Sequence, residues 1–177
     1  MTHVLSYSLL PILMIVAALT DILSFRIPNW LTVLTALLFL PMAWATGMPL
    51  VDFGWHLAAG LGLFVLGFVL FSLGLFGGGD AKLMAAAGLW FGTSQSLAFL
   101  AMTAIAGGLL AAVVVIWAFV AQMIELQGTK EGSIVHAAVK SIKPKLPYGF
   151  AFAIGAILVF PQTWWVQAAG LQVVSGH

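Results

Sequence analysis

The longest stretch with almost no charge is the feature that most constrains the fold. From Ala81 to Ile124 the chain runs for 44 residues with Lys82 as its only charged residue. At a rise of about 1.5 Å per residue, one helix of this length would be roughly twice as long as the hydrocarbon core of a bilayer is thick. The segment Gly92-Thr93-Ser94-Gln95 favours a turn. The stretch therefore predicts two helices, over 81–91 and 96–123.

The rest of the chain has the same apolar character. It is 63% hydrophobic and only 6% charged, whereas soluble domains average about 25% charged residues. Breaks rich in Gly, Pro and polar residues separate further apolar runs at 5–23, 30–46, 53–76 and 147–165. We therefore expect an all-α fold, a polytopic membrane helix bundle with six transmembrane helices. Residues 1–177 are expected to form a single domain, with a cytoplasmic loop over 125–145.

The placement of the basic residues supports six crossings. With that number, all Lys and Arg residues fall on one side: Arg26, Lys82, Lys130, Lys140, Lys143 and Lys145. The positive-inside rule puts this side in the cytoplasm, so both termini are expected outside. The sequence leaves open whether the short helix 81–91 spans fully. A helical spacing of Val135, Val139 and Ile142 favours a short interfacial helix in the basic loop.

Composition also excludes several classes of function. A net charge of +1 without a basic tract excludes an electrostatic nucleic-acid binder. The absence of Cys excludes a disulfide framework, a thiol nucleophile and a Cys-based metal site. The four His residues are scattered and are expected in loops or at the termini. We therefore expect no metal and no cofactor.

Two carboxylates within the predicted helices call for an explanation, because charges in a bilayer are costly. Asp21 lies near the end of the helix 5–23, where the helix dipole disfavours it, so that pairing with Arg26 or interfacial solvation is the structural alternative. Asp80 follows Gly77-Gly78-Gly79 and can serve as an N-cap. The glycines allow a close backbone approach and positive φ.

The pairing of these two residues is more informative than either alone. Asp21 and Asp80 are predicted on the cytoplasmic side at nearly the same depth. Two carboxylates held close together cannot both ionise easily, so they share a proton. One can then act as general base on a water while the other acts as general acid. The pair therefore indicates hydrolytic aspartyl chemistry.

The remaining polar residues have simpler expectations. Asp52 is expected to cap the third helix on the opposite side, and Asn29 to cap the second. Arg26 either anchors the chain at the membrane surface or orients Asp21 and grips substrate. Lys82 either snorkels to the interface or lies close to Asp80. Glu125 and Glu131 of the basic loop are expected to be solvated.

Three motifs resemble those of prepilin peptidases, which belong to the G-x-G-D class of intramembrane aspartyl proteases. Asp21 to Asn29 resembles their D-x-x-x-x-R-x-I-P-N signature, read more strictly as D-x4-R-I-P-N; Gly77 to Asp80 resembles G-x-G-D; and Leu146-Pro147-Tyr148-Gly149 resembles the Pro-Tyr/Phe-Gly element of their last helix. The resemblance covers about residues 12–160 and implies catalytic roles for Asp21 and Asp80. The residues implied to support catalysis or bind substrate are Arg26, Pro28, Asn29, Gly77, Gly79, Lys82, Pro147, Tyr148 and Gly149.

The resemblance also implies a substrate. This is a type IV prepilin, cut at the cytoplasmic membrane face just before its apolar helix, commonly after a Gly. Larger family members carry a four-Cys zinc region and methylate the new N-terminus, whereas this chain has no Cys. It therefore resembles the short, peptidase-only branch that serves Flp-type (tight-adherence) pili, and methyltransferase activity is not expected. The prepilin and the bilayer are the expected partners, and a homodimer is left open.

Three alternatives stay open at this point. A proton-coupled transporter also uses buried carboxylates, although usually nearer the midplane and within paired repeats. A non-enzymatic scaffold of a pilus or secretion machine would need neither Asp. A preflagellin peptidase is a related enzyme. The sequence does not show which pilin is cut, the residue preferred at the cut, or which Asp is the base.

Overall fold

The computed structural model describes residues 2–126 and 147–168, and all regular secondary structure in these ranges is helical. The predicted all-α fold is thus confirmed. The elements are α1 (Thr2–Ser24), α2 (Asn29–Ala45), α3 (Leu50–Ser72), α4 (Gly78–Leu126), α6 (Tyr148–Val159), the 3-10 helix η1 (Phe160–Gln162) and α7 (Trp164–Ala168). The predicted interfacial helix and most of the predicted basic loop lie outside the described residues.

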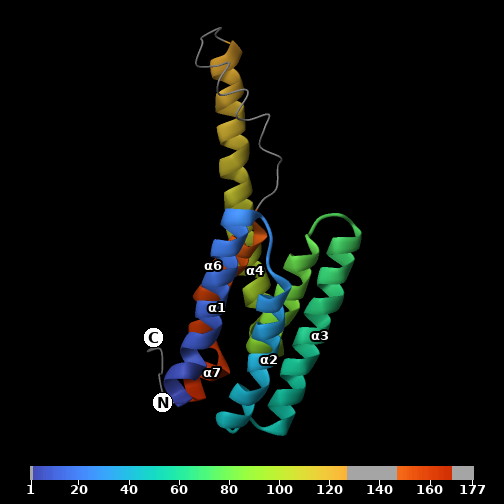
Figure 1. Cartoon of the computed structure of the whole chain (residues 1–177), viewed down its shortest axis with the longest axis vertical. Coiled ribbons are helices and arrows are strands. Elements are labelled where there is room, and N and C mark those ends of the chain that lie inside the picture. Colours follow the sequence, from blue (N-terminus) through green and yellow to red (C-terminus); the bar gives the residue numbers. More distant parts are fainter. Residues whose placement is uncertain (1, 127–146, 169–177) are drawn as a thin grey trace.

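The helix α4 is the centre of the bundle. It packs against α3, α6 and α2, while α1 packs against α6 and more lightly against α2. Successive helical segments alternate in direction (Figure 1), so that the end of α1, the end of α3 and the starts of α4 and α6 lie at the same end. We call this end, at which Asp21, Asp80 and Gly149 lie, the site end. The topology thus brings together all three motifs found in the sequence.

The outer surface of the bundle is as apolar as its interior. Large side chains such as Trp44 and Leu50 face outward and are 90% and 88% exposed. Three helices are long and apolar enough to cross a membrane, namely Tyr7–Ser24, Leu50–Ser72 and Gly78–Ala121. The helices Asn29–Ala45 and Tyr148–Gln162 are apolar but shorter. Apolar surface of this extent is stable in lipid and not in water, so the chain is an integral membrane protein.

A single residue divides α4 into two arms. Gly92 has φ 61° and ψ −179°, and the arms 78–91 and 93–126 run in opposite directions from it (Figure 1). The turn predicted at 92–95 is therefore in the right place but is confined to one residue. Both arms are longer than the predicted helices 81–91 and 96–123, and the second takes in positions 125 and 126, which the sequence assigned to the loop. Glycine is required at the break because of its positive φ and because a Cβ there would lie 2.9 Å from His56 Nε2.

Side chains from distant helices satisfy the carbonyl groups at the end of the first arm. The His56 imidazole hydrogen-bonds through Nδ1 to the carbonyl of Leu89 at 2.6 Å. The Trp165 indole N–H donates to the carbonyl of Trp90, also at 2.6 Å. The last carbonyls of a helix have no partner within the helix itself, so these two side chains act as caps. The prediction that every His lies in a loop or terminus was wrong for His56, which is buried within α3.

Two helices end earlier than predicted, each for a local reason. The third ends at Ser72 rather than Phe76, because Gly74 adopts φ 73° and forms a Schellman cap. In this cap the N–H of Leu75 donates to the carbonyl of Leu70 at 3.0 Å. The last predicted helix, 147–165, is three elements rather than one. Its first element, α6, ends just before η1, in which Pro161 has no N–H to donate to a carbonyl of the preceding turn.

Candidate active site

The carboxylate of Asp21 is buried at the site end of α1. Asp21 is 5% exposed, and its Oδ2 accepts a hydrogen bond of 2.7 Å from the backbone N–H of Gly149. Gly149 lies in the first turn of α6, where backbone N–H groups have no partner within the helix. The positive end of the α6 dipole thus faces a negatively charged group. The predicted partner Arg26 does not take this position, because a helix terminus already occupies it.

The element Pro147-Tyr148-Gly149 builds this contact. Pro147 is the N-cap residue of α6, and Tyr148 is the first helical residue. A Cβ at Gly149 would lie 2.9 Å from Asp21 Cβ and 3.2 Å from the carbonyl oxygen of Ala17. Only glycine therefore allows the start of α6 to come close enough to α1 for the hydrogen bond to Asp21.

Asp80 lies in the first turn of α4 and is held by the loop before it. Its Oδ2 accepts a hydrogen bond of 3.0 Å from the N–H of Gly77. The carbonyl of Gly77 accepts the 3.2 Å bond from Ala81 N–H that starts the helix. The sequence suggested that Asp80 could itself be the N-cap. Instead, Asp80 lies in the first turn, and its side chain reaches back to the residue that caps the helix. A Cβ at Gly77 would lie 2.8 Å from Asp80 Oδ2.

The glycine loop also lets α4 approach the segment that follows Asp21. A Cβ at Gly79 would lie 3.1 Å from the carbonyl oxygen of Ile27 and 3.2 Å from its Cβ. A Cβ at Gly78 would instead make an ordinary contact of 3.6 Å with the ring of Phe71. The crowded positions thus coincide with the two fixed glycines of G-x-G-D, and the uncrowded one with its variable position. The expected close approach is confirmed, but positive φ is not, because Gly77, Gly78 and Gly79 all lack it.

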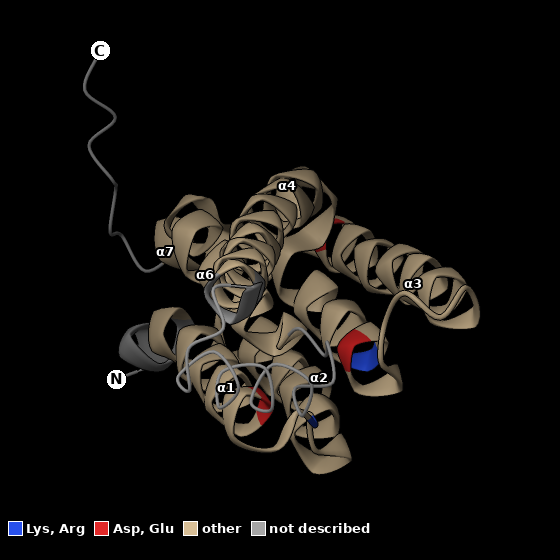
Figure 2. Cartoon of the chain, turned by 90° about the horizontal axis from the view of Figure 1, so that it is seen from above, with Lys and Arg blue, Asp and Glu red and all other residues tan. Residues whose placement is uncertain are grey.

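The two carboxylates lie at the same end of the bundle, near the end of α1 and in the first turn of α4. The residues directly before the glycines that hold them, Phe76 and Tyr148, are in contact, with ring centroids 4.8 Å apart. Seen from the site end, the ribbon carries few charged residues (Figure 2). Among the described residues no group of three or more His, Cys, Asp or Glu side chains lies where it could hold a metal ion.

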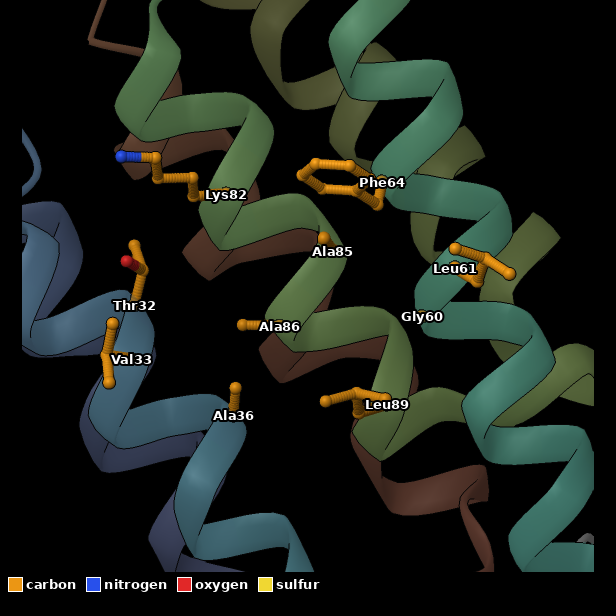
Figure 3. Close-up of a pocket in the computed structure, with 10 residues that line it drawn as sticks. All are labelled: Thr32, Val33, Ala36, Gly60, Leu61, Phe64, Lys82, Ala85, Ala86 and Leu89. Atoms are coloured by element: carbon orange, nitrogen blue, oxygen red, sulfur yellow. The ribbon is translucent and has the colours of Figure 1, made fainter.

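The other predicted site residues lie beside the pair. The ammonium group of Lys82 donates a 2.9 Å hydrogen bond to Asn29 Oδ1, and Figure 3 shows Lys82 extending from α4 toward α2, at the edge of a pocket of about 380 Å³. Pro28 is the N-cap residue of α2, so the predicted capping by Asn29 was wrong. Arg26 is exposed, and within the part of the chain that the structure describes no ion pair joins Arg26 or Lys82 to a carboxylate. The structure therefore brings Asn29 and Lys82 together but does not bring Arg26 to either Asp.

Comparison with protein families identifies the chain. Residues 8–124 match the type IV leader peptidase family. The chain belongs to that family. Membership makes it a peptidase, and the match contains Asp21 and Asp80 but ends before Pro147. Comparisons with curated proteins and with solved structures give no match.

Two features of the site were missing from the sequence interpretation of this leader peptidase. The backbone N–H of Gly149 is the partner of Asp21, although the sequence suggested Arg26. Phe76 packs on Tyr148 at the edge of the site. An aromatic residue directly before G-x-G-D, and a Pro that starts the last helix, are the sequence signals that point to these contacts.

Proposed function

We propose that this leader peptidase is an aspartyl endopeptidase with Asp21 and Asp80 as its catalytic residues. The observation that carries the proposal is the placement of the two carboxylates at the site end, where each accepts a hydrogen bond from a backbone N–H. Backbone donors hold the carboxylates in place without occupying all of their oxygen lone pairs. The arrangement leaves oxygen atoms free to bind a water between the two groups.

The proposed reaction is a hydrolysis in which the pair shares one proton. The ionised carboxylate takes a proton from the water, whose oxygen adds to the scissile carbonyl carbon. The protonated carboxyl donates to the carbonyl oxygen and stabilises the tetrahedral intermediate. A proton then passes to the amide nitrogen, and the C–N bond breaks. The products are the leader, with a new carboxylate, and the mature chain, with a new amino group.

The glycine loop suits the approach of a peptide. Gly77 has no side chain to cover Asp80, and Tyr148, at the start of α6, packs on Phe76 beside the site. Peptidases bind their scissile segment in an extended form, which needs an open strip of backbone beside the catalytic groups. Pro28, Asn29 and Lys82 stabilise the loop that faces this strip. Arg26 is exposed and available to acidic groups of substrate or lipid.

The proposed substrate is a Flp-type prepilin of the type IV class, cut just before its apolar helix. The chain removes the leader and does not methylate the new N-terminus. The proposed topology has six crossings: α1, α2, α3, the two arms of α4, and α6. Arg26 and Lys82 lie at the site end, which supports a cytoplasmic position for the site and a periplasmic position for both termini in the inner membrane.

Cleavage of a co-expressed Flp-type prepilin tests the proposal. Wild type, Asp21→Asn and Asp80→Asn are compared in membranes at equal expression. Asp52→Asn is the matched control, because Asp52 lies in the first turn of α3, at the opposite end of the bundle. We expect a leader-sized shift with wild type and the control, and none with the other two variants.

Other outcomes point elsewhere. Cleavage that survives both Asp21→Asn and Asp80→Asn would show that the catalyst lies elsewhere. Assembly of pili that survives them would favour a scaffold. Cleavage of a preflagellin but not of the prepilin would show that the proposed substrate is wrong, while the aspartyl mechanism would still hold. Transfer of a labelled methyl group to the product would contradict the peptidase-only reading.

A further inference from the structure

An apolar groove lies beside the site, on the side of α3, the second arm of α4, and α6. Its volume is about 440 Å³, within the range of about 300–1,000 Å³ that is typical of ligand pockets. The groove is separate from the pocket of Figure 3, which lies between α2, α3 and the first arm of α4. Among the described residues that form its walls none is charged.

The groove reaches two residues next to the glycines that hold the carboxylates, although the carboxylates themselves do not line it. Phe76 and Tyr148 line it, and their rings are in contact. Phe76 directly precedes Gly77, whose N–H holds Asp80. Tyr148 directly precedes Gly149, whose N–H holds Asp21. A chain that lies in the groove therefore passes directly to the place where hydrolysis is proposed.

The groove continues along α4 over the length of a substrate helix segment. Its lining on the second arm extends from Leu100 to Ala111, which is about 16 Å at 1.5 Å per residue, or roughly three helical turns. The elements that border it are apolar and belong to the membrane bundle, so an apolar chain or a lipid tail can enter it from the bilayer.

One position in the wall has no packing reason to be glycine. A Cβ at Gly108 would meet nothing within 4 Å, and Gly108 does not have positive φ. Its neighbour Gly107 would make only an ordinary contact of 3.6 Å with Ala151. Small residues allow helices to approach closely in membranes. Gly108 leaves such a space open toward the groove rather than toward its own bundle.

We propose that this groove receives one face of the apolar helical segment of the prepilin that follows the scissile bond, with Gly108 allowing the close approach. The inference rests on the proposed function and assigns a binding subsite to it. The apolar helix lies along the second arm of α4, and the leader extends past Phe76 and Tyr148 to the carboxylates. Lipid is the competing occupant, and the test separates the two.

Filling the groove tests the inference kinetically. Gly108→Leu places a side chain in the groove, and Gly62→Leu is the matched control, since a Cβ at Gly62 on α3 also meets nothing within 4 Å and the residue does not line the groove. We expect Gly108→Leu to lower kcat/KM for the prepilin on the order of tenfold, mainly through KM, because it competes with binding and leaves the carboxylates in place. The control is expected to cleave normally. Thermal unfolding in detergent verifies that both variants fold.

Cross-linking tests the occupant directly, and the absence of Cys from the chain makes it specific. Gly108→Cys and Gly62→Cys are each made in the Asp80→Asn background and combined with a prepilin that carries one Cys in its apolar segment. We expect a disulfide-linked product from Gly108→Cys and not from Gly62→Cys. Normal cleavage by Gly108→Leu, or equal cross-linking from both Cys variants, would overturn the inference and leave lipid as the occupant. A prepilin that wild type leaves uncut would instead overturn the proposed function.

Discussion

The contact between α6 and Asp21 makes a quantitative prediction for Gly149→Ala. The added methyl group would lie 2.9 Å from Asp21 Cβ, 3.0 Å from Asp21 Oδ2 and 3.2 Å from the carbonyl oxygen of Ala17. These neighbours include helix backbone and cannot rotate away. Overpacking of this kind costs about 1–3 kcal/mol. Separating the helices to relieve it would also weaken the 2.7 Å hydrogen bond to Asp21, and a hydrogen bond to a charged group contributes about 1.5–3 kcal/mol.

The two effects are measured by different assays. Thermal unfolding in detergent micelles is expected to show a lower Tm for Gly149→Ala than for wild type. Prepilin cleavage is expected to become slower as well. If the displaced carboxylate raises the activation free energy by about 1–3 kcal/mol, kcat falls by about 5- to 150-fold. Gly54→Ala is the matched control, because a Cβ at Gly54 meets nothing within 4 Å. Its Tm is expected to stay equal or rise, as alanine favours a helix over glycine by about 0.5–1 kcal/mol.

Two results would refute the reasoning. If Gly149→Ala kept both the Tm and the cleavage rate of wild type, α6 would not be packed on Asp21 as the structure describes. If Gly149→Ala and Gly54→Ala changed the Tm by the same amount, the effect would come from the helical backbone and not from contact with the carboxylate.

Three further predictions concern other close contacts. Gly79→Ala is expected to lower cleavage and Tm, whereas Gly78→Ala stays near wild type; equal effects would contradict the crowding derived for Gly79, and the same two assays measure it. Gly92→Ala is expected to destabilise by at least about 1–2 kcal/mol in denaturant unfolding, since it combines φ 61° with a contact to His56; an unchanged midpoint would mean that the break does not need a left-handed residue. Trp165→Phe removes an indole donor and leaves a buried carbonyl without its partner, at a cost of about 1–3 kcal/mol, and an unchanged Tm would show that the bond contributes nothing.

The sequence predicted the helices better than their ends. The lengths of the apolar stretches and the placement of charges between them were enough to locate the long helices. A bilayer requires a minimum length of apolar helix and keeps charged residues outside that length. The ends depended on single residues whose roles cannot be separated in sequence. Gly74 forms a helix cap, whereas Gly60 and Gly67 face neighbouring helices at close range. A glycine that permits close helix contact cannot be distinguished in the sequence from a glycine that ends a helix, because the difference lies in the backbone conformation.

The candidate site follows the same rule. The motifs singled out Asp21 and Asp80 and predicted them at one end of the bundle, and in the structure both lie at the site end. The partner of Asp21 was not predictable from charge, because a backbone N–H of α6 occupies the place expected for Arg26. Such a donor has no side-chain signature, and its position depends on how a helix more than a hundred residues later packs on α1. The six crossings remain a prediction, since only three described helices meet the length for a span.

The break at Gly92 determines how far the first arm of α4 extends into the membrane. The first arm of α4, residues 78–91, is about 21 Å long at 1.5 Å per residue, shorter than a hydrocarbon core of about 30 Å. A helix that ends inside lipid would normally expose carbonyl groups that water cannot reach. Here the imidazole of His56 and the indole of Trp165 take the place of that water. The chain can therefore reverse its direction within the membrane, and the distance from the site end to this reversal is set by the length of the first arm rather than by the thickness of the bilayer.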